Sequence, residues 1–142
     1  VILGKKTGAT PDGRYAGDEI SKNGSPSVGM DKEGVTALMK SALKIRPYTY
    51  CESHCLDVML HPSAVSGDEG LEIMKSLLMM YVKNGGQTVQ FNIFNAETLK
   101  DAQKHPEKYQ NLQVRVCGWN VLWNNLSTEE QNAYITRAEN IK

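Results

Sequence analysis

Hydrophobic residues recur at helical spacing in residues 33–45, on a face formed by Val35, Leu38, Met39, Ala42 and Ile45. Pro47 ends this predicted helix. A second helix is predicted over residues 67–84, because acidic residues occupy its first turn and two glycines follow it. Hydrophobic positions surround most of this second helix, so we expect it to be buried on more than one side.

Alternating hydrophobic and polar residues predict strands elsewhere in the chain. Residues 87–94 read QTVQFNIF, which places Val89, Phe91 and Ile93 on one face and Gln90 and Asn92 on the other. A short strand is predicted over residues 112–116, and another within residues 48–60, which Pro62 bounds.

Capping residues predict two further helices. Asn95 is placed to cap a helix over residues 96–105, which ends before Pro106. Ser127 and Glu130 have the spacing of a capping box at the start of a last helix, over residues 128–140. The alternation of helices and strands indicates an α/β fold. Because the strands are too few to close a barrel, we expect the chain to be one part of a larger α/β body.

The first third of the chain is rich in glycine and is predicted to be mostly turns and loops. Hydrophobic residues such as Tyr15, Ile20 and Met30 are spread through it, so it does not resemble a flexible linker. A long loop of this kind usually lies against a large body.

Charge and composition exclude several classes of partner. The 142 residues carry 16 basic and 16 acidic side chains, so no net field favours nucleic acid or an anionic membrane. No hydrophobic run approaches the ~20 residues that a membrane-spanning helix needs. The first residues contain neither an initiator Met nor the apolar core of a signal peptide, and the cysteine count is odd. We therefore expect reduced thiols and a cytoplasmic location.

Three groups of residues could carry chemistry of their own. Cys51, His54 and Cys55 are possible zinc or iron ligands, but no second ligand pair follows, which favours buried or incidental cysteines. His61, before a proline, is either a hydrogen-bonded structural residue or a residue near a substrate cavity. His105 is predicted to lie at an exposed helix end.

Gly118 lies between residues that favour burial, Cys117 and Trp119. The simplest interpretation is a tight turn between residues 112–116 and 121–123, in which glycine supplies a positive φ.

The surrounding sequence favours a second interpretation of this glycine. VRVCGWNV, residues 114–121, resembles the glycyl radical signature of the pyruvate formate-lyase-like family, R-V-x-G followed by an aromatic residue. Residues 85–112 and 11–45 resemble two further blocks of the family, in the same order. The resemblance covers nearly the whole chain and divides it into a loop-rich segment, residues 1–32, that packs on the parent barrel and a glycyl radical domain, residues 33–142.

The resemblance implies the C-terminal portion of a ten-stranded α/β barrel of the pyruvate formate-lyase type, incomplete on its own. It places the radical on Gly118, with Arg115, Val116, Cys117 and Trp119 supporting the loop. The Arg115 guanidinium would anchor the loop, and Val116, Trp119 and Val121 would shield the radical from water and oxygen.

The resemblance also implies partners. A radical AdoMet enzyme with a 4Fe-4S cluster would install the radical, so this chain would bind no cofactor or metal itself. None of its cysteines matches the family's catalytic thiyl cysteine, which would lie in the remainder of a homo-oligomeric enzyme. The chain alone would therefore be inactive.

The resemblance does not determine which reaction the parent enzyme catalyses. It could be of the arylacetate decarboxylase, alkylsuccinate synthase, dehydratase or formate acetyltransferase type, or another lyase or transferase reaction of anaerobic metabolism. The alternative function is a stand-alone repair partner that replaces an oxygen-damaged radical domain in a full-length lyase. A plain structural module with a glycine turn is the third interpretation.

Overall fold

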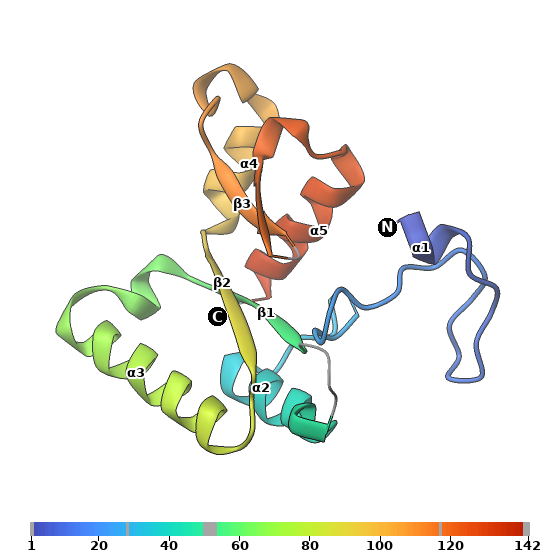
Figure 1. The fold of residues 1–142 in the computed structure, drawn as a ribbon. Helices are drawn as coiled ribbons and strands as arrows, with labels where there is room; N and C mark the ends of the chain where they lie inside the picture. Colours follow the sequence, from blue (N-terminus) through green and yellow to red (C-terminus); the bar gives the residue numbers. More distant parts are fainter. Residues whose placement is uncertain (1, 28, 50–53, 117, 141–142) are drawn as a thin grey trace.

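The computed structural model describes residues 2–27, 29–49, 54–116 and 118–140. Within these ranges the strands form two small sheets (Figure 1). Strands β1 (Cys55–Leu60) and β2 (Thr88–Ile93) pair in parallel, and β3 (Gln113–Val116) and β4 (Trp119–Leu122) form an antiparallel hairpin. The fold is therefore mixed α/β, but the described residues form no closed barrel, because they contribute only these two short ladders.

Five α-helices accompany the strands: α1 (Ile2–Lys5), α2 (Val35–Leu43), α3 (Gly67–Lys83), α4 (Ala96–Lys104) and α5 (Thr128–Glu139) among the described residues. The short 3-10 helices in the same ranges are η1 (Pro47–Thr49), η2 (Pro62–Val65), η3 (Pro106–Lys108) and η4 (Trp123–Asn125). The helices predicted from sequence are all present, with ends at most two residues inside the predicted bounds. None of the helices in the described part of the chain combines the length and the hydrophobicity that crossing a lipid bilayer requires.

The β1–β2 sheet separates two hydrophobic clusters. On one face, Leu56, Val58 and Leu60 pack with α2 and α3 around Met39 and Tyr81. On the other face, Met59 joins a cluster built from α4, α5 and the hairpin, with Trp123 fully buried. Figure 1 shows this division: α2 and α3 lie on one side of β1 and β2, and α4, α5 and β3 lie on the other.

The polar face of β2 is the more deeply buried one. Gln90 and Asn92 are 9% and 5% exposed, whereas Ile93 on the apolar face is 41% exposed. Alternation correctly predicted two different faces. The polar face is buried because the hairpin lies against it and supplies hydrogen-bond partners for both amides.

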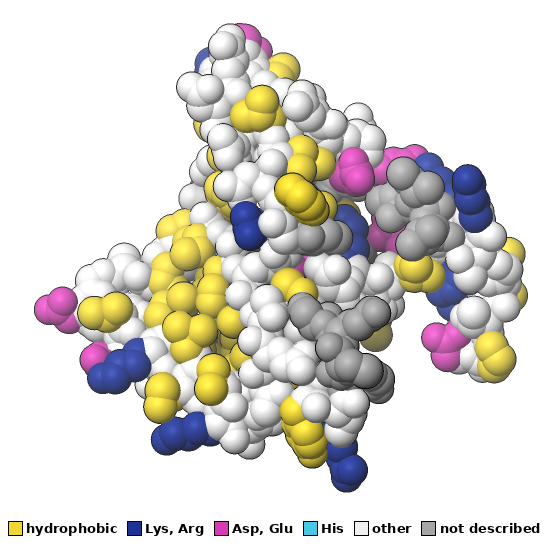
Figure 2. Space-filling model, viewed as in Figure 1, with side chains coloured by type: hydrophobic (Ala, Val, Ile, Leu, Met, Phe, Trp, Pro, Cys, Tyr) yellow, Lys and Arg dark blue, Asp and Glu magenta, His cyan; other side chains and the backbone are white. Residues whose placement is uncertain are grey.

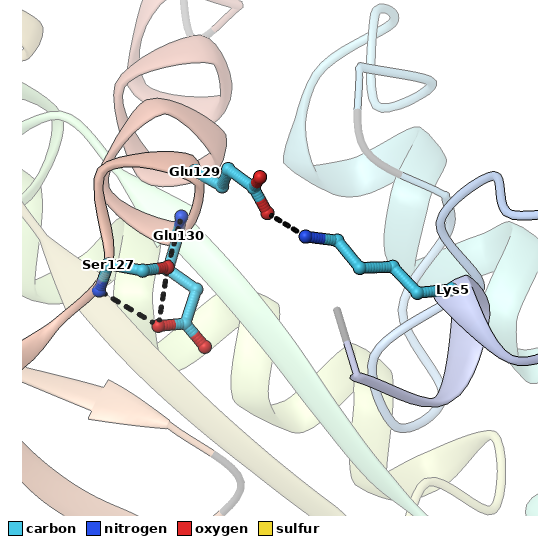
Figure 3. A network of polar contacts seen from close by, with 4 residues as sticks. All are labelled: Lys5, Ser127, Glu129 and Glu130. Atoms are coloured by element: carbon cyan, nitrogen blue, oxygen red, sulfur yellow. Dashed lines mark hydrogen bonds and ion pairs between the residues drawn. The ribbon is translucent and has the colours of Figure 1, made fainter.

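Both predicted caps are confirmed. The Asn95 side chain accepts a hydrogen bond of 2.7 Å from the Thr98 amide at the start of α4. Ser127 Oγ accepts from the Glu130 amide at 3.3 Å, and Glu130 Oε2 accepts from the Ser127 amide at 3.1 Å, which completes the capping box of α5 (Figure 3).

An ion pair links the N-terminal helix α1 to the start of α5. Lys5 Nζ lies 2.7 Å from Glu129 Oε2, between α1 and the first turn of α5 (Figure 3). Both side chains are well exposed, so this ion pair contributes at most about 1 kcal/mol.

Helix α3 is buried on one face only, contrary to the prediction. Gly70, Leu77 and Tyr81 are buried, and five large apolar side chains of the helix stay exposed: Leu71, Ile73, Leu78, Met79 and Val82. Figure 2 shows hydrophobic side chains gathered on the α3 side of the molecule. The prediction fails within this chain because β1, β2 and α2 cover one side of α3 and no described segment covers the other.

The strand predicted within residues 48–60 is shorter than expected. Residues 47–49 form the 3-10 helix η1, and the strand begins at Cys55. Residues 50–53, which include Cys51, lie outside the described residues.

Arg14 organises the first loop. Its guanidinium donates to the carbonyl oxygens of Asp18 at 2.8 Å and Thr7 at 3.3 Å, and also to that of Gly8. One side chain thereby joins the two ends of the loop over residues 7–18, which reaches away from the rest of the chain in Figure 1.

Candidate functional site: the Gly118 hairpin

Gly118 occupies the turn of the β3–β4 hairpin, as the turn interpretation predicted. Val116 pairs with Trp119, so two residues, 117 and Gly118, connect the strands. The φ of Gly118 is +90°, a region that costs an L-residue about 1–2 kcal/mol. The turn alone therefore favours glycine at this position.

Asn92 attaches strand β3 to the polar face of β2. Its Oδ1 accepts from the Arg115 amide at 2.8 Å, and its Nδ2 donates to the Arg115 carbonyl at 3.0 Å. Tyr134 on α5 donates to the same carbonyl at 2.9 Å. A side-chain amide thus replaces the backbone of a neighbouring strand at Arg115.

Gln90 reaches the turn itself. Its Oε1 accepts from the Gly118 amide at 3.1 Å, and its Nε2 donates to the Asp57 carboxylate. Asp57 and Gln90 are cross-strand neighbours in the β1–β2 ladder, and both are buried. A continuous hydrogen-bonded chain therefore leads from the centre of the sheet to the glycine.

The Asp57 carboxylate is surrounded by donors from the N-terminal segment and from β2. Asn23 Nδ2 donates to both its oxygens, at 3.1 and 3.3 Å, and Ser25 Oγ accepts from the Asp57 amide at 2.8 Å. Burial raises the pKa of Asp57 above its usual value, although hydrogen bonds from Gln90 and Asn23 and the positive charges of Arg137 and Lys22 oppose this rise.

The side chains expected to shield Gly118 do not enclose it within this chain. Trp119 is 74% exposed, Val116 and Val121 are half-buried, and Gly118 itself is exposed. A Cβ built on Gly118 would meet no atom within 4 Å beyond its chain neighbours in the described residues. Within the described residues, the turn at Gly118 therefore stays open to solvent.

The Arg115 side chain makes a hydrogen bond across the hairpin. Its Nη1 donates to Asn120 Oδ1 at 3.0 Å, and the residue is exposed. The backbone of Arg115 makes the contacts to β2 and α5 described above. Cys117, the other residue of the turn, lies outside the described residues.

The histidine and cysteine positions hold no metal cluster in the described ranges. His61 caps η2: its Nδ1 accepts from the Ser63 amide at 3.2 Å and lies 2.7 Å from Ser63 Oγ, as the structural interpretation predicted. His105 is exposed at the end of α4, also as predicted. Cys55 is half-buried, with its sulfur 3.9 Å from Asp57 Oδ1.

Comparison with known proteins identifies the domain that this hairpin belongs to. Residues 20–124 match the family described as glycine radical. The chain belongs to this family. Its Gly118 hairpin lies inside the matched residues, and the glycyl radical domain is a component of decarboxylases, dehydratases and other lyases.

The relatives are much longer than this chain. Indoleacetate decarboxylase of Tractidigestivibacter scatoligenes is 41% identical over 96% of the chain and 16% of its own length. The 4-hydroxyphenylacetate decarboxylase glycyl radical subunit of Clostridioides difficile is 40% identical over 96% of the chain and 15% of its own length.

Structural similarity agrees with sequence similarity. A solved structure from work on 1,2-propanediol dehydration in Roseburia inulinivorans has a TM-score of 0.88 and 40% identity, covering 96% of this chain and 16% of that one. The glycyl radical domain described here thus spans about one sixth of the proteins that it matches.

Four residues of the hairpin support did not stand out in the sequence: Asp57, Gln90, Asn92 and Tyr134. The sequence around Asp57 carries a signal that could have identified Gln90 and Asn92. The apolar run that surrounds Asp57 indicates a sheet buried on both faces, and a polar face on its partner strand then needs buried hydrogen-bond partners.

Proposed function

We propose that Gly118 stores the radical of a pyruvate formate-lyase-like enzyme. The observation that supports this most is its place at the tip of an anchored hairpin, where a Cβ would meet no described atom within 4 Å apart from those of its chain neighbours. The rest of the enzyme would therefore supply both the cysteine that reacts with this Cα and the residues that cover it. The R-V-x-G-aromatic signature at residues 115–119 supports the same glycine.

Glycine suits the radical for a reason beyond the turn. Loss of one hydrogen from the Cα leaves a planar centre, which is stabilised when the flanking amide and carbonyl are coplanar with it. At a φ of +90° the amide is far from that arrangement, so radical formation requires rotation about the N–Cα bond. Only glycine makes such a rotation without steric cost, because it has no Cβ.

The proposed cycle needs two partners. A radical AdoMet enzyme with a 4Fe-4S cluster removes the Gly118 hydrogen. The radical then takes a hydrogen atom from a cysteine thiol outside this chain, which regenerates glycine and leaves a thiyl radical to attack the substrate. In this proposal Arg115, Val116, Cys117 and Trp119 support the loop, and the rest of a homo-oligomeric cytoplasmic enzyme shields it.

The uncovered surfaces of the chain fit a larger body. Exposed apolar side chains of α3 and the loop-rich residues 1–32 would pack against a ten-stranded barrel of the remaining sequence. The reaction class that we favour is C–C or C–X bond cleavage or formation, with an arylacetate decarboxylase type first and dehydratase, alkylsuccinate synthase and formate acetyltransferase types as the other outcomes. His61 would be near the substrate in this arrangement.

The test is anaerobic activation of the complete protein that contains this chain, followed by electron paramagnetic resonance. A doublet signal is expected from the native sequence and none from Gly118→Ala. Gly13→Ala is the matched control, since Gly13 has a φ of +95° and equally open space around a Cβ. A doublet of native intensity in Gly118→Ala would overturn the assignment.

A further inference from the structure

The orientation of the Gln90 side chain is fixed by chemistry at both of its ends. The Gly118 amide can only donate a hydrogen bond, so the carboxamide atom that faces it must be the oxygen. The nitrogen then faces the Asp57 carboxylate, which can accept a hydrogen bond. If the Gln90 carboxamide were reversed, its NH2 group would face the Gly118 N–H, so two donors would meet. The Asp57 carboxylate would also lose a donor.

The hydrogen bond from Gly118 to Gln90 holds only the part of the turn that lies before the N–Cα bond of Gly118. Gln90 holds the N–H of Gly118, which belongs to the peptide unit before the N–Cα bond. Rotation about φ moves the Cα hydrogens and the following carbonyl while that N–H stays in place. Gln90 can therefore hold one side of Gly118 still while the other side turns.

We propose that Asp57 and Gln90 are positioning residues that fix the peptide before Gly118, so that radical formation changes only the N–Cα torsion. This inference rests on the proposed radical role of Gly118. Asp57 sets the orientation of Gln90 from the buried sheet, and Gln90 transmits it to the turn. Asn23 supports the carboxylate from the N-terminal segment, which links that segment to the hairpin.

The first test uses hydrogen exchange in the complete, unactivated protein, with fragmentation that resolves the Gly118 amide. Gln90→Met removes the acceptor, and we expect exchange at Gly118 to accelerate by about fivefold or more, as for loss of one hydrogen bond. Exchange in the β1–β2 ladder should stay unchanged, which shows that the sheet remains folded. Gln110→Met, an exposed glutamine, is the matched control.

The second test exchanges donor and acceptor within the pair. Gln90→Glu alone places two carboxylates against each other and should also accelerate exchange at Gly118. Adding Asp57→Asn reverses the roles: the new amide donates to the new carboxylate, and a carboxylate oxygen still accepts from Gly118. We expect the double variant to restore protection to within about twofold of the native value.

Activation supplies a readout that a merely structural role would not change. The coupling of the exchangeable Gly118 N–H proton to the radical should differ from native in Gln90→Met and return in the double variant. Unchanged exchange at Gly118 in Gln90→Met would overturn the role of Gln90, and a double variant that stays unprotected would overturn that of Asp57. Absence of any doublet in the native protein would refute the radical role of Gly118, whereas the exchange results test the hydrogen-bonded pair separately.

Discussion

Asn92 binds Arg115 as a neighbouring strand would: its side-chain amide accepts from the Arg115 N–H and donates to the Arg115 carbonyl, at 2.8 and 3.0 Å. The Gly118 hairpin is thus attached to the β1–β2 sheet through side chains rather than through a continuous ladder. Several expected outcomes depend on this attachment.

Asn92→Asp should loosen the hairpin. A carboxylate still accepts from the Arg115 amide but no longer donates to its carbonyl, and a buried charge is added, so stability should fall by about 2 kcal/mol or more. Urea unfolding measures this loss, and hydrogen exchange of residues 113–122 locates it. Asn111→Asp, at an exposed position, should change neither measurement. Equal stability of the two variants would contradict the anchoring role.

Arg115→Lys should lower the radical yield with little effect on folding. Arg115 is exposed and its guanidinium donates to Asn120 across the hairpin, so its replacement should change stability by less than about 1 kcal/mol. In the proposed role the guanidinium anchors the loop through its planar set of donors, which a lysine cannot reproduce. Electron paramagnetic resonance measures the yield, with the exposed Arg46→Lys as the control. Native yield in Arg115→Lys would refute the role.

Addition of the activating enzyme should open the hairpin. The buried side chain of Val114 holds the base of the hairpin in the core. Its other attachments to β2 and α5 include a few side-chain hydrogen bonds, each with a net contribution of about 1 kcal/mol, so the turn end can detach while the β1–β2 ladder stays intact. Hydrogen exchange of residues 117–126 should accelerate when the activating enzyme is present, while exchange within α3 should not. An identical rate with and without that enzyme would show that the hairpin is reached without opening.

Asp57 should make the chain less stable as pH rises. Because its pKa is higher in the folded protein than the usual 3.8, the unfolded chain releases this proton first. The stability contribution is therefore complete below pH 3.8 and is lost as pH rises through the folded pKa. The melting temperature of Asp57→Asn relative to native should increase across that window and then level off. A constant difference would show that Asp57 does not titrate differently in the two states.

Local signals in the sequence predicted the parts of the fold that depend on neighbours along the chain. The Asn95 cap, the Ser127–Glu130 box and the positive φ of Gly118 each involve residues within a few positions. Periodicity located the helices and β2 for the same reason. The family signature supports the radical role that we propose for Gly118, which the turn alone does not reveal.

Contacts between distant segments were not predictable in this way. Asp57 and Gln90 are 33 residues apart, and Asn92 and Arg115 are 23 apart. Alternation in β2 showed two faces but not which one is more deeply buried, because that depends on where the hairpin docks. For α3, the pattern predicted burial around most of the helix, but the described residues cover only one side.

The uncovered side of α3 determines how residues 1–142 would behave if produced alone. Leu71, Leu78 and Val82 would face water at 64%, 37% and 63% exposure, next to further apolar side chains. Concentrated preparations of the isolated chain would then self-associate through this surface, and mild detergent or a co-expressed covering segment would keep it monodisperse.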